Sequence, residues 1–243
     1  NTNITGTTTM TVVAPPSPAI SGPSILCAGT SGAVYTTESG MANYSWNISS
    51  GGTITSGGTV TDNSVTVTWN TAGVRSVSVN YKNSSGCISP VPATYPVTVN
   101  PLPVPTIIGP NTVCAGTSKV YSTQTGMTNY KWVISSGGTI VSGGTTSDNT
   151  VTIVWNTPGN ENVSINYTNS NGCSAASPTV YNVTVNSLPA PLLSGPTVAC
   201  VGAVGNVYTT DVGKTNYLWT VSSGGTITGG GTFGSASATI QWN

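Results

Sequence analysis

The sequence predicts an all-β chain in which small β-sandwich domains follow one another in tandem. Three observations lead to this prediction. The sequence repeats itself at intervals of 86 or 87 residues, apolar residues alternate with Ser, Thr and Asn, and turns rich in Gly separate the alternating stretches. Such an interval is typical of one small domain per repeat, and apolar residues at every second position indicate strands with one buried face.

Cysteine and tryptophan mark the repeats. Cys27, Cys114 and Cys200 are separated by 87 and 86 residues (114 − 27 and 200 − 114). Two sets of Trp residues recur at intervals of 86 and 87 residues. These spacings predict that the chain is a segment of a longer array, with the final strand and linker of a preceding repeat, two complete repeats and one partial repeat over residues 1–18, 19–104, 105–191 and 192–243.

Each repeat contains a Tyr-x-Trp segment that a Ser-Ser-Gly-Gly turn follows. It reads NYSWNISSGGTIT from Asn43, NYKWVISSGGTIV from Asn129 and NYLWTVSSGGTIT from Asn216. Because side chains alternate along a strand, the Tyr, the Trp and the next Ile or Val share one face, which we expect in the core. The alternative is a surface of exposed aromatic rings that stack on sugars. The predicted core residues include Trp46, Trp69, Trp132, Trp155, Trp219 and Trp242.

Further alternating stretches complete the first repeat. One face of each is apolar, in the sets Val65, Val67 and Trp69, then Val77, Val79 and Tyr81, then Tyr95, Val97 and Val99. Gly-rich turns such as Gly57–Gly58 separate them. About seven short strands per repeat favour an immunoglobulin-like β-sandwich.

The cysteines predict one disulfide within each complete repeat. Each such repeat has a Cys near its start and another after its sixth expected strand, which gives the pairs Cys27–Cys87 and Cys114–Cys173, with the partner of Cys200 beyond Asn243. Closing a loop of this size contributes about 4 kcal/mol in the chain-entropy model. A zinc site or a nucleophilic Cys is not favoured, because the chain has no Cys-x-x-Cys pair and no His. Disulfides predict an extracellular setting.

Composition excludes several kinds of protein. Five Lys and Arg balance five Asp and Glu, and charged residues make up only 4% of the chain. Nucleic-acid binding depends on clustered Lys and Arg, which are absent here. No apolar run is long enough for a membrane span. The surface is therefore expected to consist of hydroxyl and amide groups, which suits a secreted protein better than a cytosolic enzyme.

Catalytic and metal-binding groups are scarce. The only carboxylates are Glu38, Asp62, Asp148, Glu161 and Asp211. Glu38 aligns with Gln124 and Asp211 in the later repeats, so its position does not keep one chemistry. No repeat offers the pair of acids that glycoside hydrolysis uses, or the many oxygen ligands of a calcium site. We therefore expect no enzymatic activity, no cofactor and no metal.

The linkers PPSPAI, PLPVPT and SLPAPL place Pro at nearly alternate positions. Such segments favour an extended polyproline-type backbone, which makes a semi-rigid spacer. The sequence therefore predicts repeats joined by short, stiff connections.

The segments ISGPSILCAGTSGAVYTT, NYSWNISSGGTI and VTVTWNTAGVRSVSVNYKNSSGC resemble the PKD-like repeats of very large surface proteins in gliding members of the Bacteroidota. The resemblance covers essentially the whole chain. It implies a surface filament for adhesion and gliding motility, export by the type IX secretion system and contact with the gliding machinery. The turn SSGG stands where ordinary PKD domains have an acidic Asp-Gly turn, so no calcium role is carried over.

Three functions remain open at this point. The repeats could form the stalk of a cell-surface adhesin, whose partners would be neighbouring repeats, surface polysaccharide or other filament chains. They could also be a spacer in a multidomain secreted enzyme, since both roles need only repeated sandwiches. A carbohydrate-binding module is the third alternative, and it would need exposed aromatic side chains.

Overall fold

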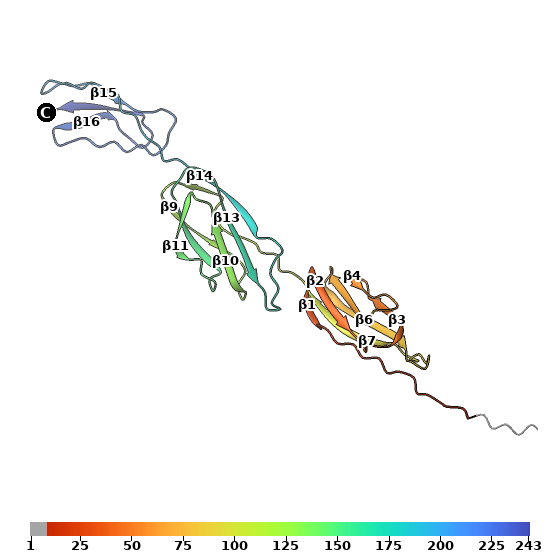
Figure 1. Cartoon of the computed structure of the whole chain (residues 1–243). Coiled ribbons are helices and arrows are strands. Elements are labelled where there is room, and N and C mark those ends of the chain that lie inside the picture. Colours follow the sequence, from red (N-terminus) through yellow and green to blue (C-terminus); the bar gives the residue numbers. More distant parts are fainter. Residues whose placement is uncertain (1–8) are drawn as a thin grey trace, which may run out of the picture. The chain divides into compact units, whose positions relative to one another are not determined.

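A computed structural model describes residues 9–243. The chain forms two compact units, and the boundary between them in the sequence lies between Asn186 and Ser187. All regular elements among these residues are β-strands, so the predicted all-β class is confirmed (Figure 1). The predicted final strand of a preceding repeat falls partly on residues 1–8, outside the described residues. Residues 9–20 form no strand.

The first repeat is a sandwich of seven strands in two sheets. The pairing order is β2–β5–β4 in one sheet and β1–β7–β6–β3 in the other. All pairs are antiparallel except β1 and β7, which run parallel. The strands are β1 (Ile25–Cys27), β2 (Thr30–Thr36), β3 (Ala42–Ile48), β4 (Gly52–Gly57), β5 (Ser64–Trp69), β6 (Gly73–Lys82) and β7 (Ala93–Asn100).

The second repeat has the same topology. Its sheets have the orders β9–β12–β11 and β8–β14–β13–β10, again with one parallel pair, between β8 and β14. The immunoglobulin-like sandwich is therefore confirmed for both complete repeats. The strands are β8 (Thr112–Cys114), β9 (Thr117–Ser122), β10 (Thr128–Ile134), β11 (Gly138–Gly143), β12 (Thr150–Trp155), β13 (Gly159–Thr168) and β14 (Thr179–Asn186).

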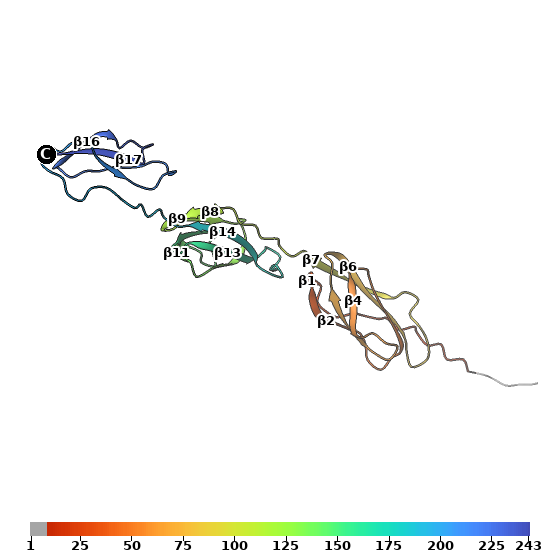
Figure 2. The same cartoon turned by 90° about the horizontal axis from the view of Figure 1, so that it is seen from above.

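The unit that begins at Ser187 contains only one sheet, in the order β15–β17–β16. Figure 2 labels its strands β16 and β17. Its strands are β15 (Asn206–Thr209), β16 (Gly225–Gly230) and β17 (Ser237–Trp242). They correspond to β9, β11 and β12. Residues 215–221, which align with β10, form no strand. In the second repeat β10 pairs with β13, and no strand among residues 187–243 corresponds to β13.

The core of each complete repeat lies between its two sheets. Val151, Ile153 and Trp155 of β12 are fully buried, and Thr152 and Val154 between them are partly exposed, so the predicted alternation is confirmed. The indole Nε1 of Trp155 donates to the hydroxyl of Tyr121 at 3.0 Å, and the same bond joins Trp69 to Tyr35 in the first repeat. These bonds satisfy the polar atoms of large side chains that burial removes from water.

The backbone conformation explains two residues that recur in each repeat, the Asn before the Tyr-x-Trp segment and a Gly of the turn that follows it. Asn43, Asn129 and Asn216 have positive φ angles of 52°, 53° and 59°, a region that Asn tolerates better than most residues. In the complete repeats a bulge lies at this point in the strand. A Cβ on Gly52 would come within 2.7 Å of the Trp69 ring, so the turn lets the backbone pass directly over the core Trp.

Candidate functional site: the junction between the first two repeats

The predicted core tryptophans occupy two kinds of position. Trp69 and Trp155 are fully buried and Trp132 is 7% exposed, whereas Trp46, Trp219 and Trp242 are half-buried. Every Trp and Tyr within residues 9–243 is buried or half-buried. The described surface therefore offers no row of free aromatic rings for stacking on sugars.

The two cysteines of the first repeat lie at opposite ends of its sandwich. Cys27 pairs with Asn100 in the register of β1 and β7, where the chain leaves the repeat. Cys87 lies in the loop between β6 and β7, at the start of that same eight-residue β7. A strand of this length spans roughly 25 Å, whereas the Cα atoms of a disulfide lie within about 7 Å of each other.

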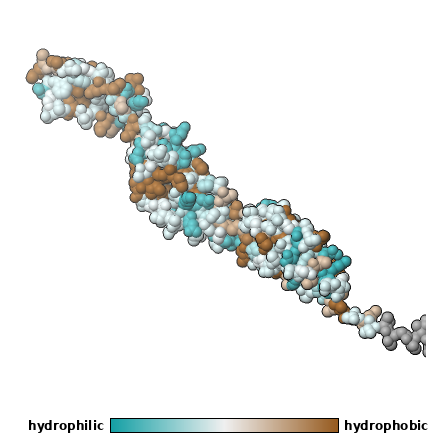
Figure 3. All heavy atoms as spheres, in the orientation of Figure 1, coloured by the Kyte–Doolittle hydropathy of each residue, from teal (hydrophilic) through white to brown (hydrophobic). Residues whose placement is uncertain are grey.

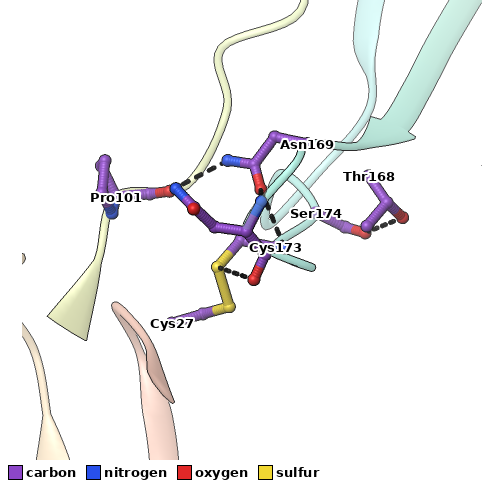
Figure 4. Close-up of a disulfide and its surroundings, with 7 residues drawn as sticks. Cys27, Pro101, Thr168, Asn169, Cys173 and Ser174 are labelled. Atoms are coloured by element: carbon purple, nitrogen blue, oxygen red, sulfur yellow. Dashed lines mark hydrogen bonds between the residues drawn. A yellow bond between two sulfur atoms is a disulfide. The ribbon is translucent and has the colours of Figure 1, made fainter. Parts of the chain in front are cut away.

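The disulfide of the structure joins Cys27 of the first repeat to Cys173 of the second (Figure 4). Their Cα atoms are 5.7 Å apart, and 146 residues separate them in sequence. The predicted pairs Cys27–Cys87 and Cys114–Cys173 are therefore wrong. The parallel pairing of β1 with β7 places Cys27 beside the exit of its own repeat, next to the loop of the following one.

Asn169 connects the Cys173 loop to the linker. Its Oδ1 accepts hydrogen bonds from the backbone N–H groups of Cys173 and Asn171, both at 3.0 Å. Its Nδ2 donates to the carbonyl of Pro101 at 3.3 Å (Figure 4). The side chain of Asn169 is thus hydrogen-bonded both to the linker after Asn100 and to the loop that carries the disulfide-bonded Cys173.

The rest of the linker is bonded to the second repeat. Gln124 donates to the carbonyl of Val104 at 3.2 Å and accepts from the N–H of Thr106 at 3.1 Å. The hydroxyl of Thr179 donates to the carbonyl of Pro105 at 2.7 Å. The Pro-rich segment is therefore bonded to the entry end of the repeat that follows it.

Three cysteines form no disulfide within residues 9–243: Cys87, Cys114 and Cys200. Cys114 and Cys200 are exposed, and Cys87 is half-exposed. Their places in the repeats are not random. Cys114 and Cys200 align with the bonded Cys27, and Cys87 aligns with the bonded Cys173.

The carboxylates serve local structure. Glu38 accepts hydrogen bonds from the hydroxyls of Thr37 and Tyr81 at 2.6 and 2.7 Å. Burial by itself would raise the pKa of Glu38, but these bonds and those from backbone N–H groups, including that of Ala19, outweigh it and lower the pKa to about 2. Burial, together with the bond to Glu38 and its charge, raises the pKa of Tyr81 to about 12.

Asp62 and Asp148 close equivalent turns. Each accepts from the hydroxyl and the N–H of the Thr three residues earlier, and the hydroxyl bond is the main reason that its pKa is lowered. Glu161 accepts from the Ser135 hydroxyl and the Gly137 N–H. No group of three or more His, Cys, Asp or Glu side chains gathers among residues 9–243 in a way that suits a metal ion.

A hollow of about 1030 Å³ lies in the unit that begins at Ser187. Tyr217, Trp219 and Leu193 are among its lining residues. In the second repeat the counterpart of Tyr217, Tyr130, packs its ring against Tyr167 of β13, with 5.8 Å between the ring centroids. The hollow is therefore the core face that β13 covers in the second repeat, and it needs no ligand to explain it.

Among residues 9–243, no helix has the length and apolar character needed to cross a membrane.

The chain was compared with known structures, curated proteins and protein families. The chain is similar in structure to a marsupial T cell receptor (14% identity, 92% of this chain and 91% of that chain, TM-score 0.40) and to the D00-D0 domain of intimin (14%, 69% and 98%, 0.37). It is also similar to fibronectin(III)-like modules of Clostridium thermocellum CbhA (13%, 70% and 95%, 0.32). No curated protein matched the sequence. The model of the PKD-like domain matches residues 5–97, 100–183 and 187–243, and the chain therefore belongs to the PKD-like domain family.

Proposed function

We propose that this chain is a stalk segment of a secreted cell-surface adhesin that supports attachment and gliding motility, similar to the gliding-motility adhesin SprB. The repeats work by adding length and by resisting bending and unfolding. The observation that carries the proposal is the disulfide between Cys27 and Cys173, because it links two consecutive repeats instead of closing one.

Two covalent connections at one junction resist motions that one connection permits. Domains joined by a single peptide segment move relative to each other by default. Here the peptide leaves the first repeat at Asn100, and Cys27 lies beside it in the pairing of β1 and β7. The disulfide therefore adds a second attachment close to the first and limits bending and twisting at the linker.

The same disulfide changes how the chain carries tension. Residues 28–172 lie inside the closed loop between Cys27 and Cys173. Tension that enters near the start of the first repeat passes through the disulfide and leaves near the end of the second. Extension of the loop is prevented for as long as the disulfide is intact. A stalk that pulls a cell along a surface needs this resistance.

The surface suits many weak contacts. Pale shades, between the hydrophilic and hydrophobic extremes, cover most of the visible face (Figure 3), and the chain has no net charge. In this proposal adhesion to polysaccharide or to other filament chains comes from repetition along the array, since linked weak sites gain avidity without a strong single site. Export uses the type IX secretion system, and the gliding machinery moves the filament.

The test is to remove whole repeats from the full protein and leave its ends intact. Cells should export the shortened protein at the same level and lose attachment and movement progressively as repeats are removed. A second variant replaces Cys27 and Cys173 by Ser, which keeps the length and removes only the disulfide, and it should weaken attachment under load because the proposal rests on that disulfide. Unchanged attachment after large deletions would contradict the proposal and favour the alternative role as a spacer in a secreted enzyme.

A further inference from the structure

We propose that every cysteine of the repeats forms a disulfide between neighbouring repeats. In each link the Cys at the end of the first strand of one repeat bonds the Cys in the sixth-to-seventh-strand loop of the next. Cys114 thus bonds the loop Cys of the repeat that follows the second, and Cys87 bonds the first-strand Cys of a repeat that precedes the first. This pairing does not depend on a role in adhesion.

The exit end of the second repeat has the same backbone geometry as the bonded exit end of the first. Cys27 pairs with Asn100, and the N–H of the residue after it donates to the Asn100 carbonyl at 2.8 Å. Cys114 pairs with Asn186, and the N–H of Ala115 donates to the Asn186 carbonyl, also at 2.8 Å. The thiol of Cys114 is therefore presented beside the outgoing chain, as Cys27 is.

The entry end of the first repeat is likewise built as the bonded entry end of the second. Asn83 holds the N–H of Cys87 at 2.9 Å, as Asn169 holds that of Cys173 at 3.0 Å. Asn83 also donates to the carbonyl of Ala14 at 3.2 Å, and Ala14 aligns with Pro101 in the later linker. The loop and the incoming chain are thus held together in the arrangement that accompanies the formed disulfide.

The chemistry of each link is ordinary thiol oxidation. Two thiols lose two protons and two electrons to a disulfide oxidant, such as oxidised glutathione or an oxidised dithiol protein, and one S–S bond forms while the oxidant's S–S bond is reduced. The Cys114 thiol is exposed and the Cys87 thiol is half-exposed, so both are accessible to a partner.

Overlapping links would make the whole array continuous. The loop from Cys27 to Cys173 contains Cys114, so a link from Cys114 onward begins before the first loop closes. Cys200 follows Cys173 by 27 residues (200 − 173) and starts the next link. Tension could then travel from disulfide to disulfide through short stretches of chain, and each junction would be bridged by a disulfide.

The test adds the cysteines that Cys114 and Cys87 are proposed to bond. One variant carries a copy of residues 157–191 after Asn243, which supplies the third repeat with a counterpart of Cys173. A second variant carries a copy of residues 105–186 directly before Ala14, which supplies a counterpart of Cys114 ahead of Cys87. Both are oxidised in a glutathione buffer, alkylated, digested without reduction and mapped by mass spectrometry.

The first variant should contain two disulfides, Cys27–Cys173 and a new link from Cys114 to the appended Cys, and the second should add a link from the copied Cys114 to Cys87. Cys114→Ser should abolish only the new disulfide of the first variant, and Cys200→Ser should leave that disulfide intact. The proposal is overturned if the appended Cys of the first variant pairs with Cys200. It is also overturned if that appended Cys, or the copied Cys114 of the second variant, is alkylated in repeats that amide exchange reports as folded, whereas the copied Cys173 has no partner and should be alkylated. If one added repeat does not fold, the other variant decides the outcome.

Discussion

The second repeat and the unit that begins at Ser187 contain almost the same Tyr-x-Trp segment, yet only one of them forms a strand there. NYKWVIS contributes to β10 in the second repeat, where Trp132 is 7% exposed. NYLWTVS has no regular structure, and Trp219 is half-buried. The hydrogen bonds from both indoles to a loop carbonyl, that of Asp148 or Ser235, are the same length, 2.9 Å.

The difference lies in the neighbouring strand. β10 pairs with β13 and packs against the core, whereas residues 215–221 pair with no strand among residues 9–243. The three strands β15, β16 and β17 nevertheless keep the pairing of β9, β11 and β12. The comparison shows that the local sequence determines the three-stranded sheet, and that the second sheet depends on contacts from a later part of the repeat.

The largest expected effect concerns the disulfide that ties the first two repeats together, whereas residues 187–243 as described carry no disulfide. Pulling on the two ends of the oxidised chain should extend residues 187–243 and leave the Cys27–Cys173 loop closed. Reduction should release additional extension on the order of 500 Å, because 146 residues each span about 3.3–3.6 Å. Force spectroscopy with and without reductant measures this length. Equal extension with and without reductant would contradict the disulfide between Cys27 and Cys173.

Substitution of equivalent core Trp residues should have the next largest effect, and it should differ between the second repeat and the third unit. Trp155→Ala should cost the second repeat roughly 3–5 kcal/mol, because the side chain is fully buried. Trp242→Ala, at the equivalent but half-buried position, should cost about 1 kcal/mol. Denaturant-dependent amide exchange, resolved by repeat, gives both values. Val120→Ala on the exposed face is the matched control, and a similar loss for both Trp variants would break the comparison.

Completing the third unit should convert its Tyr-x-Trp segment into a strand. In the chain that carries a copy of residues 157–191 after Asn243, amides of residues 215–221 should exchange more slowly than in the present chain, as those of β10 do. Amides of β16 and β17 should change less, because their sheet is already formed. Rapid exchange at residues 215–221 in a completed repeat would show that the pairing partner is not the cause.

The smallest effect distinguishes the first repeat from the second by pH. The pKa of Glu38 is about 2 in the folded repeat, below its ordinary value of 4.5, so its bonds stabilise the first repeat above pH 4.5. This contribution is lost as the pH falls from 4.5 to 2. Gln124 occupies the same position in the second repeat and does not titrate.

Glu38→Gln should therefore remove part of the acid sensitivity of the first repeat without changing the second. Thermal unfolding of the oxidised chain at pH 6 and pH 3, followed by repeat-resolved exchange, measures this difference. An acid response that is the same in the parent chain and in the Glu38→Gln variant would contradict the assigned role of these hydrogen bonds.

The sequence was sufficient to predict most of the fold. The alternation of Val65, Val67 and Trp69 reports directly which face is buried, and the structure agrees. Disulfide pairing was not accessible in the same way. A bond within each repeat and a bond between consecutive repeats recur with the same period, so spacing alone cannot separate them. The parallel pairing of β1 with β7, which places Cys27 at the exit end, separates them and depends on tertiary structure.

The sequence therefore predicted which residues form the junction between the first two repeats, but not which of them bond to each other. The sequence identifies the cysteines and the Pro-rich linker, whereas the hydrogen bonds of Asn169 and Gln124 to that linker become visible only in the folded chain. A sequence signal existed in the repeated Asn83 and Asn169, which both stand four residues before the loop Cys.

The most direct measurement is disulfide mapping of the oxidised chain. Free thiols are alkylated, the chain is digested with pepsin without reduction, and linked peptides are identified by mass spectrometry. The account predicts one linked pair, which joins the peptides of Cys27 and Cys173, with Cys87, Cys114 and Cys200 alkylated. Linked peptides of Cys27 with Cys87 and of Cys114 with Cys173 would contradict it.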